Sequence, residues 1–387
     1  MKKIVILTST RAEYGLLRPV IFKLKSVTEF DVKIVVTGMH LSSAFGNTYM
    51  EIEHDGFCID KKIEILMASD TSAGMSKTMG LALISFAEYF EEVKPDGLLV
   101  LGDRFETLAI CCAAMNAGIP IFHMHGGERT EGLVDEAVRH SISKMSYVHF
   151  TSTEEYRKRV IQLGEAPSRV FNVGATGVEN ALHEKLMSRD ELSASLNGAC
   201  EKPYIVGTFH PVTLEADSVQ KQCNEFVEAI TEYDKVNFVI TKANADSGGR
   251  YINERLEIIS KKCRHIHLFD SLGMVRYLSA IKYSEAVIGN SSSGLIEVPS
   301  FHIPTVNIGN RQRGRVQSAS VINCSADRHE IIMAIERALS ASFRNSIKSA
   351  SNPYGKGDTS ENIVNIIQAI YKKGDVDLRK NFYDIDF

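Results

Sequence analysis

The sequence predicts an α/β protein made of two Rossmann-like, doubly wound domains that face a cleft. Short apolar runs of strand length alternate with longer segments of helical period along nearly the whole chain. The alternation weakens around Val173–Pro203 and restarts at Tyr204. A chain of 387 residues is also too long for one ordinary hydrophobic core. These features predict two α/β halves of similar size that join near residue 175.

The first half contains runs that are apolar at successive positions, which is typical of strands buried on both faces of a parallel sheet. The runs are Lys3–Leu7, Val32–Val36, Gly97–Leu101, Ile119–His123 and Val148–Thr151. The segments between them are long enough for crossover helices and have helical spacing of apolar residues. The predicted helices are Gly15–Lys25, Ser76–Glu92, Phe105–Asn116, Asp135–Met145 and Glu154–Leu163.

The second half repeats the pattern, with predicted helices between its apolar runs. The predicted strands are Tyr204–Thr208, Asn237–Thr241, His265–Phe269, Ala286–Ile288 and Thr305–Ile308. Each half therefore predicts its own parallel sheet with helices on both faces.

Composition and charge exclude several classes of function. The formal net charge of −4 gives no general attraction to nucleic acid or to an anionic membrane. The apolar run that opens the chain is too short for a signal peptide, and no apolar stretch is long enough to span a bilayer. Seven cysteines without a C-x-x-C pair favour a reducing compartment, so we expect a cytoplasmic protein without disulfides.

Polar clusters directly follow several of the predicted strands. They are Thr8–Gly15, Gly102–Glu106, His125–Arg129, His210–Pro211 and Asn290–Ser293. Ligands of doubly wound sheets bind outside the carboxyl ends of the strands, so this coincidence predicts an enzyme-like site there.

The stretch Ala286–His302 has the pattern of an anion site. A strand ends at Gly289-Asn290, three serines follow, and a helix-like apolar pattern begins. Free backbone N–H groups at a helix start favour a phosphate, and the hydroxyls of Ser291 and Ser292 add donors. Glu297 is placed about one turn later, where its carboxylate could accept hydrogen bonds from a ribose. The alternative is a serine-capped helix with a solvated glutamate.

Two further segments carry arginines that could reach a phosphate. Arg11 lies in TSTRAEYG after the first strand, and Arg311 lies in GNRQRGRV after a later one. The first segment also contains Glu13 but lacks the G-x-G-x-x-G pattern, which makes NAD an unsuitable cofactor. In both segments the alternative is an arginine that is merely solvated.

Acid–base candidates cluster after three strands. Asp103 and Arg104 end the Gly97–Leu101 run, although an N-cap with a surface partner would explain them equally well. His125 and Glu128 follow the next run, and Asp135 begins a helix, where carboxylates are favoured in any case.

Two further histidine patterns each have a functional and a structural interpretation. His123 and His125 would share one face of a strand, which invites a metal interpretation, but no third ligand follows at a recognised spacing. No metal site is therefore expected. Pro211 restricts the backbone of His210 to an extended conformation and so fixes where its ring points. A structural histidine is the alternative there.

At these residues the sequence resembles the UDP-N-acetylglucosamine 2-epimerases, and within them the hydrolysing, NeuC-like branch that makes N-acetylmannosamine for sialic acid synthesis. The resemblance covers nearly the whole chain. Its motifs are TRAEYG (Thr10–Gly15), TGMHLSSAFGNT, LGDRFE, HGGE with DEAVRHSISKMS, TSTEEYRKRVIQLGE, FHPVT, GNSSSGLIEVPS and NIGNRQRGR.

The resemblance implies a fold like that of the GT-B glycosyltransferases. Residues 1–174 would form the first domain, residues 175–365 the nucleotide-binding domain, and a helix at 366–387 would pack back on the first. It also implies a cytoplasmic homodimer or homotetramer that needs no cofactor and acts on UDP-N-acetylglucosamine.

The family's site roles carry over position by position. Arg11, Ser291, Ser292 and Arg311 would hold the diphosphate, Glu297 the ribose, and Leu272 would lie near the uracil. Asp103, Asp135 and His210 would surround the sugar as acid–base groups, with Arg104 beside them, and Glu13 and Asn290 count among the binding candidates. Many relatives have a glutamate where this chain has His125, so His125 and Glu128 are alternative proton carriers.

The implied reaction is elimination of UDP to a 2-acetamidoglucal, followed by hydration to N-acetylmannosamine. A hydrolysing epimerase of a 2,4-diacetamido-trideoxy nucleotide sugar (legionaminic acid type) would share nearly every motif. A GT-B glycosyltransferase and a non-catalytic nucleotide-sugar sensor are further alternatives, and the clustered acid–base groups argue against the sensor.

Overall fold

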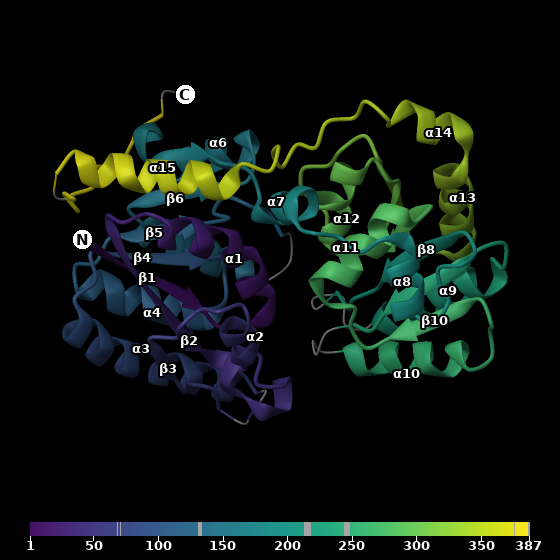
Figure 1. Ribbon diagram of the computed structural model, residues 1–387, viewed down its shortest axis with the longest axis horizontal. Coiled ribbons are helices and arrows are strands. Elements are labelled where there is room, and N and C mark those ends of the chain that lie inside the picture. The colour runs from purple at the N-terminus through teal and green to yellow at the C-terminus, as the bar shows by residue number, and fades with distance from the viewer. Residues whose placement is uncertain are drawn as a thin grey trace. The chain divides into compact units, whose positions relative to one another are not determined.

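Two α/β units make up the chain, each with its own sheet (Figure 1). The computed structural model describes residues 1–67, 69, 71–130, 134–212, 218–243, 248–374 and 376–385. Unit 1 comprises residues 1–128, 134–180 and 354–387, and unit 2 comprises residues 129–133 and 181–353. The expected boundary at 174 differs from this division, because residues 175–180 belong to unit 1.

Unit 1 is built on a parallel sheet with the strand order β3-β2-β1-β4-β5-β6-β7 among the described residues. Its strands are β1 Lys2–Thr8, β2 Phe30–Thr37, β3 Lys61–Ile63, β4 Gly97–Leu101, β5 Ile121–Met124, β6 Val148–Thr151 and β7 Val170–Asn172. Its helices are α1 Arg11–Lys25, α2 Tyr49–His54, α3 Ser72–Val93, α4 Phe105–Asn116, α5 Asp135–Met145, α6 Glu154–Gln162 and α15 Thr359–Lys372. Helix α7, Thr176–His183, crosses the boundary between the units.

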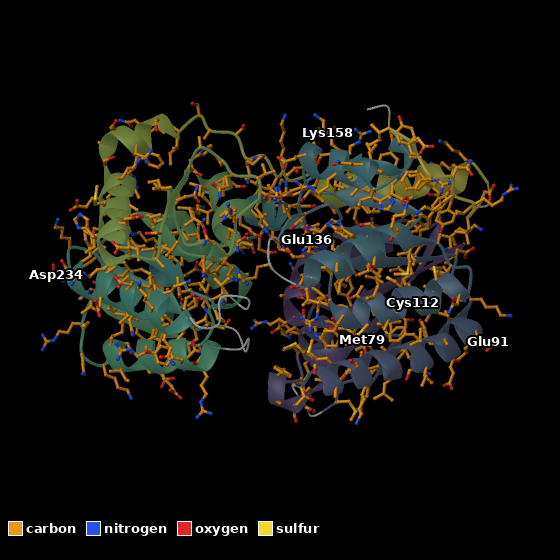
Figure 2. All side chains as sticks on the ribbon, turned by 180° about the vertical axis from the view of Figure 1, so that it is seen from behind. Met79, Glu91, Cys112, Glu136, Lys158 and Asp234 are labelled. Carbon is orange, nitrogen blue, oxygen red and sulfur yellow. The ribbon has the colours of Figure 1, made fainter. Side chains whose placement is uncertain are left out.

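Both faces of this sheet are buried, as the apolar runs predict. On β1, Ile4 and Ile6 pack in one core with α1 and α15, whereas Val5 and Leu7 pack in a second core with α3 and α4. Met79 of α3 and Cys112 of α4 lie in this second helix layer (Figure 2). Alternate side chains of each strand therefore serve opposite cores.

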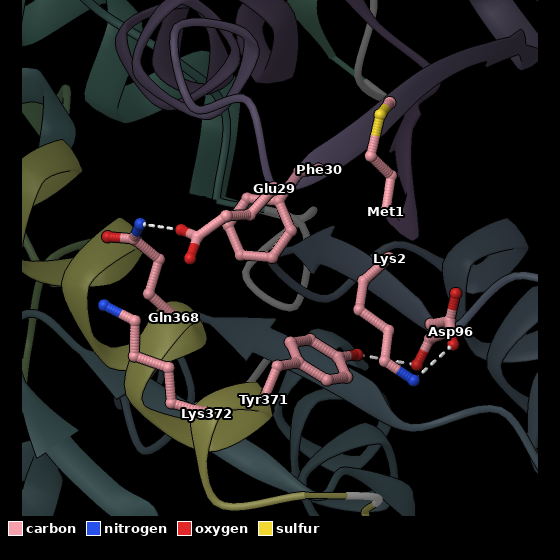
Figure 3. Close-up of a pocket in the computed structure, with 8 residues that line it drawn as sticks. All are labelled: Met1, Lys2, Glu29, Phe30, Asp96, Gln368, Tyr371 and Lys372. Carbon is pink, nitrogen blue, oxygen red and sulfur yellow. Dashed lines mark hydrogen bonds and ion pairs between the residues drawn. The ribbon is translucent and has the colours of Figure 1, made fainter.

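Helix α15 closes the first core of unit 1. It lies along α1 (Figure 1), and its Tyr371 hydroxyl donates to the carbonyl of Asp96 at 2.7 Å. A surface hollow at the amino end of β1 contains this contact and the Lys2–Asp96 ion pair of 3.0 Å (Figure 3). The helix spans 359–372 rather than the expected 366–387, and the described residues beyond Gly374 form no helix or strand.

Unit 2 repeats the topology with the strand order β10-β9-β8-β11-β12-β13 among its described residues. Its strands are β8 Tyr204–Thr208, β9 Asn237–Thr241, β10 Ile266–Phe269, β11 Ala286–Gly289, β12 Thr305–Ile308 and β13 Val321–Cys324. Its helices are α8 Arg189–Ser195, α9 Val219–Glu232, α10 Gly249–Ser260, α11 Gly273–Tyr283, α12 Ser293–Ile296, α13 Arg328–Leu339 and α14 Ala341–Ser346. Both sheets are thus doubly wound in the same order, which confirms the predicted fold class.

No described helix combines the length and the apolar character that a membrane-spanning segment requires. All seven cysteines are free thiols, and Cys111 is fully buried in the second core of unit 1.

Candidate active site

Each sheet reverses its strand order between two neighbouring strands. In unit 1 the reversal lies between β1 and β4, and in unit 2 between β8 and β11. The segments that follow such a pair of strands go to opposite faces of the sheet, and a crevice opens between these two segments. The segments that enter these two crevices are Ser9–Glu13 and Gly102–Arg104 in unit 1, and Phe209–His210 and Asn290–Ser291 in unit 2. Four of the five predicted polar clusters therefore lie at the switch points, whereas His125–Arg129 follows β5.

In unit 2, Asn290 joins the ends of both strands. Its side-chain oxygen accepts from the backbone N–H of His210 at 2.7 Å, and its amide nitrogen donates to the His210 carbonyl at 2.8 Å. Asn290 is almost fully buried, so these two bonds fix its side chain. The sequence places Asn290 among the binding candidates, but the structure shows that its side chain positions His210.

The serine-rich turn after β11 starts a helix that is much shorter than the sequence pattern indicates. Helix α12 covers only Ser293–Ile296 and continues as a 3-10 turn, Val298–Phe301, that contains Pro299. Ser292 makes no capping bond through its side chain, and the Ser291 hydroxyl accepts weakly from the N–H of Ser293 at 3.4 Å. The capping that would have explained these serines structurally is therefore largely absent from the described contacts.

Two neighbours of this turn bear on its chemistry. Glu297 ends α12 and lies close to the buried phenol of Tyr277 on α11. Burial raises the pKa of Tyr277 to about 12, a Ser293 hydrogen bond opposes the shift, and the Glu297 charge adds to it. Tyr277 is therefore a neutral hydrogen-bonding group at neutral pH.

The loop after β12 brings an arginine to the same turn. Arg311 Nη1 donates to the carbonyl of Asn290 at 3.1 Å, and Gln312 Nε2 donates to the same oxygen at 2.9 Å. This pairing holds the guanidinium of Arg311 beside the serine turn, where an anion would bind. Leu272, the expected uracil neighbour, is buried at the start of α11, and its carbonyl accepts from Arg276 at 2.9 Å.

In unit 1, one buried guanidinium organises the acid–base candidates. Arg139 of α5 is 1% exposed, and its Nε donates to Asp103 at 2.8 Å. Its Nη1 donates to the Glu136 carboxylate at 3.0 Å and to the Glu128 carbonyl at 2.7 Å. Arg139 lies in the motif DEAVRHSISKMS but is not among the predicted site residues. Its spacing of one helical turn from Asp135 is the signal that could have identified it.

Asp135 begins α5 beside this cluster. Burial raises the pKa of its carboxyl and the charge of Asp103 adds to the shift, whereas Arg139 and Arg104 oppose it. A carboxyl that holds its proton to higher pH can exchange it nearer to neutrality, which suits general acid–base chemistry.

Arg104 lies between two buried carboxyl groups. Its Nε donates to Glu106 at 2.5 Å, and although burial opposes its charge, the carboxylates of Glu106 and Glu13 raise its pKa. Glu13 closes a capping box at the start of α1: one oxygen accepts from Ser9 N–H at 2.7 Å and from Thr10 N–H at 3.0 Å. Glu13 therefore shapes the β1–α1 turn. Arg11, by contrast, is exposed, and its Nε pairs with Glu51 at 3.0 Å.

His125 lies outside the strand that was expected to carry it. Strand β5 ends at Met124, and His125 turns away in the left-handed region with φ 65°. His123 stays in the sheet, where its Nε2 meets the Gly102 carbonyl at 2.8 Å and burial lowers its pKa to about 3. The expectation that both imidazoles share one face is therefore wrong. Among the residues that the structure describes, no three potential ligands cluster as a metal site.

His125 instead pairs with Glu128. Its Nδ1 lies 2.8 Å from Glu128 Oε1, and the Ser152 hydroxyl donates to the same oxygen at 3.1 Å. The glycines between them make this tight loop. A Cβ on Gly127, at φ 77°, would come within 2.4 Å of the Tyr156 carbonyl. Ser152 was not among the predicted site residues, because it lies 24 residues from Glu128.

Two doubly wound parallel-sheet units, with a serine turn beside Arg311 in one and a buried cluster of carboxylates around Arg139 in the other, define the class of α/β proteins to which this chain belongs. Comparison with known proteins narrows this class. A family model described as UDP-N-acetylglucosamine 2-epimerase matches residues 23–368. The chain belongs to this family.

Curated relatives match most or all of the chain. It is 42% identical over 386 residues to the polysialic acid biosynthesis protein P7 of Escherichia coli, covering 100% of this chain and 98% of that protein. It is 40% identical over 344 residues to the GDP/UDP-N,N'-diacetylbacillosamine 2-epimerase (hydrolyzing) of Campylobacter jejuni, covering 89% of each. The S. aureus MnaA–UDP co-structure has the same fold, with a TM-score of 0.79 and 21% identity over 95% of this chain and 96% of that chain.

Proposed function

We propose that this protein is a hydrolysing 2-epimerase that converts UDP-N-acetylglucosamine to N-acetylmannosamine and UDP. The proposal is carried by the Asp103–Arg139–Asp135 cluster at the switch point of unit 1. It occurs in a chain that is 40% identical to a protein named as a hydrolysing 2-epimerase. A carboxyl whose pKa is raised beside a second carboxylate supports acid–base catalysis.

The anion-type turn of unit 2 is assigned to the nucleotide. Arg311 and the hydroxyls of Ser291 and Ser292 would bind the diphosphate, and Glu297 would bind the ribose. Stabilising the leaving diphosphate matters most at the moment when the bond between C1 and oxygen breaks, because negative charge develops there. These groups therefore supply leaving-group stabilisation.

The unit 1 cluster and His210 are assigned to proton transfer. Once UDP begins to leave, C1 becomes oxocarbenium-like and the proton on C2 becomes acidic. A base removes this proton to give the 2-acetamidoglucal. Water then adds at C1, and a proton returns to the opposite face of C2. Asp103, Asp135 and His210 are the candidate groups, with Arg104 beside them.

A second candidate substrate is a 2,4-diacetamido-trideoxy nucleotide sugar. The observation that favours it is the 40% identity to the Campylobacter jejuni enzyme that is named for diacetylbacillosamine. The reaction at C1 and C2 would be the same, so the difference lies only in how the protein accommodates the substituents at C4 and C6.

A substrate panel tests the proposal. The purified protein is incubated with UDP-N-acetylglucosamine, UDP-N,N'-diacetylbacillosamine and UDP-glucose, and the products are identified by NMR. We expect free N-acetylmannosamine and UDP from the first sugar. Release of free sugar only from the diacetamido substrate would assign the alternative, and a UDP-linked epimer would contradict hydrolysis.

A further inference from the structure

The hydrogen bond between His125 and Glu128 determines which nitrogen of the imidazole ring can accept a proton. Because Glu128 accepts from Nδ1, the neutral imidazole carries its lone pair on Nε2. Nε2 is buried and has no hydrogen-bond partner among the described residues. Buried ring nitrogens are normally paired, although Nδ1 of His140 and Nδ1 of His149 also lack a partner among the described residues. What distinguishes His125 is its place at the carboxyl end of β5, where a parallel sheet binds its ligands, so its unpaired nitrogen suits contact with a substrate.

The backbone of His125 supports a functional origin. A histidine at φ 65° is strained relative to the extended region, and glycine would avoid this strain. The chain nevertheless holds the residue in place: its N–H donates to the Phe150 carbonyl at 2.9 Å. Arg159 donates to the Gly127 carbonyl at 2.5 Å, and Arg139 holds the Glu128 carbonyl at 2.7 Å. Such strain persists where the surroundings over-determine it, typically at functional sites.

Arg139 also connects this loop to the acid–base cluster. The same guanidinium that holds the Glu128 carbonyl holds the Asp103 carboxylate. Since Arg139 is fully buried, the loop and Asp103 have fixed positions relative to each other. His125 therefore belongs to the constellation at this edge of the unit 1 sheet.

We propose that Nε2 of His125 is the base that takes the proton from C2 of the sugar, with Glu128 and Ser152 as positioning residues. This rests on the proposed function. As the bond between C1 and oxygen breaks, its electron pair leaves with UDP. The C2–H pair becomes the double bond between C1 and C2, and the proton moves to Nε2. The Glu128 carboxylate then stabilises the imidazolium through Nδ1–H, and the Ser152 hydroxyl keeps that carboxylate in position.

Chemical rescue tests this assignment. His125→Gly removes the ring, relieves the backbone strain and leaves space for free imidazole. We expect kcat to fall by about 100-fold or more, as for loss of a general base, and added imidazole to restore at least about 10-fold. Affinity for UDP should stay within about twofold of wild type, because the nucleotide groups lie in unit 2. If His125→Gly is misfolded by circular dichroism, His125→Asn replaces it, since asparagine tolerates the left-handed region.

Glu128→Gln tests the positioning role. With substrate deuterated at C2, a slower proton transfer should lower kcat, leave KM near the wild-type value and increase the isotope effect on kcat. A purely structural role for Glu128 would lower stability without changing the isotope effect.

His149→Gln is the matched control. His149 also pairs with a buried carboxylate, Glu165, at 3.1 Å, but it lies within β6 and is fully buried. We expect this variant to lose thermal stability and to show no response to imidazole.

The results for the wild type and for His125→Gly test the proposed function and the role of His125 separately. Turnover of UDP-N-acetylglucosamine or of the diacetamido sugar by the wild type tests the proposed function alone. If the wild type turns over neither sugar, both proposals fail. An active wild type together with a fully active His125→Gly variant overturns only the role of His125. A loss in that variant that imidazole leaves unchanged overturns it as well.

Discussion

At the scale of single residues, the structure shows the hydrogen-bond partners of polar side chains that the sequence could only place at strand ends. Asn290, a predicted binding residue, bonds through its amide to the backbone of His210, 80 positions away. Glu13, another predicted binding residue, caps α1. The type of residue at a strand end could be predicted from the sequence. Its partner could not, because the partner comes from a distant segment.

Arg311→Ala tests the proposed diphosphate site at this scale. Loss of a charge-assisted contact should weaken UDP binding by roughly 1.5–3 kcal/mol, measured by isothermal titration calorimetry. Arg337→Ala on α13 is the control, since this arginine stacks on Phe343 at the surface of the same unit. Equal UDP affinities in the two variants would exclude the serine turn as the diphosphate site.

Glu13 gives unit 1 a predictable pH dependence. Burial outweighs its hydrogen bonds and the Arg104 charge and raises its pKa from 4.5 to about 7. Between these values the unfolded chain has lost the proton and the folded chain keeps it, so stability falls as pH rises. Relative to Glu13→Gln, the wild type should lose up to roughly 3 kcal/mol between pH 4.5 and 7 and nothing further above pH 7.

Urea unfolding followed by circular dichroism at a series of pH values measures this difference. The Gln variant keeps an acceptor oxygen for the turn and has no charge to bury. Parallel stability curves for the two proteins would mean that Glu13 ionises normally in the folded state.

At the scale of elements, the strands with a continuous apolar run were predictable, and three edge strands without one were not. The expected strand Gly97–Leu101 matches β4. The edge strands β3, β7 and β13 are three or four residues long and lack a continuous apolar run, so periodicity could not reveal them. The apolar pattern after Ser293 predicts the start of a longer helix. In the structure, α12 ends after one turn, because a 3-10 turn that contains Pro299 follows it.

Gly289 is the element-scale feature that builds the unit 2 switch point. It has φ 130°, and a Cβ would come within 1.9 Å of the Thr208 carbonyl on β8. Gly289→Ala should therefore destabilise unit 2 by about 3 kcal/mol through overpacking and backbone strain. Gly309→Ala, at φ 71° with nothing within 4 Å of its Cβ, should cost only about 1 kcal/mol.

Both variants are compared with wild type by the midpoint of urea unfolding. A smaller loss for Gly289→Ala than for Gly309→Ala would show that β8 and β11 do not approach as closely as described.

At the scale of the whole molecule, both sheets have the same strand order, which explains why the alternation of strands and helices in the sequence predicts two similar halves. Each half has two polar clusters at its own reversal point, between β1 and β4 and between β8 and β11. The periodic pattern was sufficient to predict this architecture. It could not set the boundary at residue 180 or the return of the chain at residue 354, because these depend on tertiary contacts.

The central claim is that UDP leaves by elimination and that C2 then takes a proton from solvent. The most direct measurement is NMR of the sugar released from UDP-N-acetylglucosamine in heavy water. We expect free N-acetylmannosamine with deuterium at C2. Released sugar that retains its original proton at C2 would contradict it.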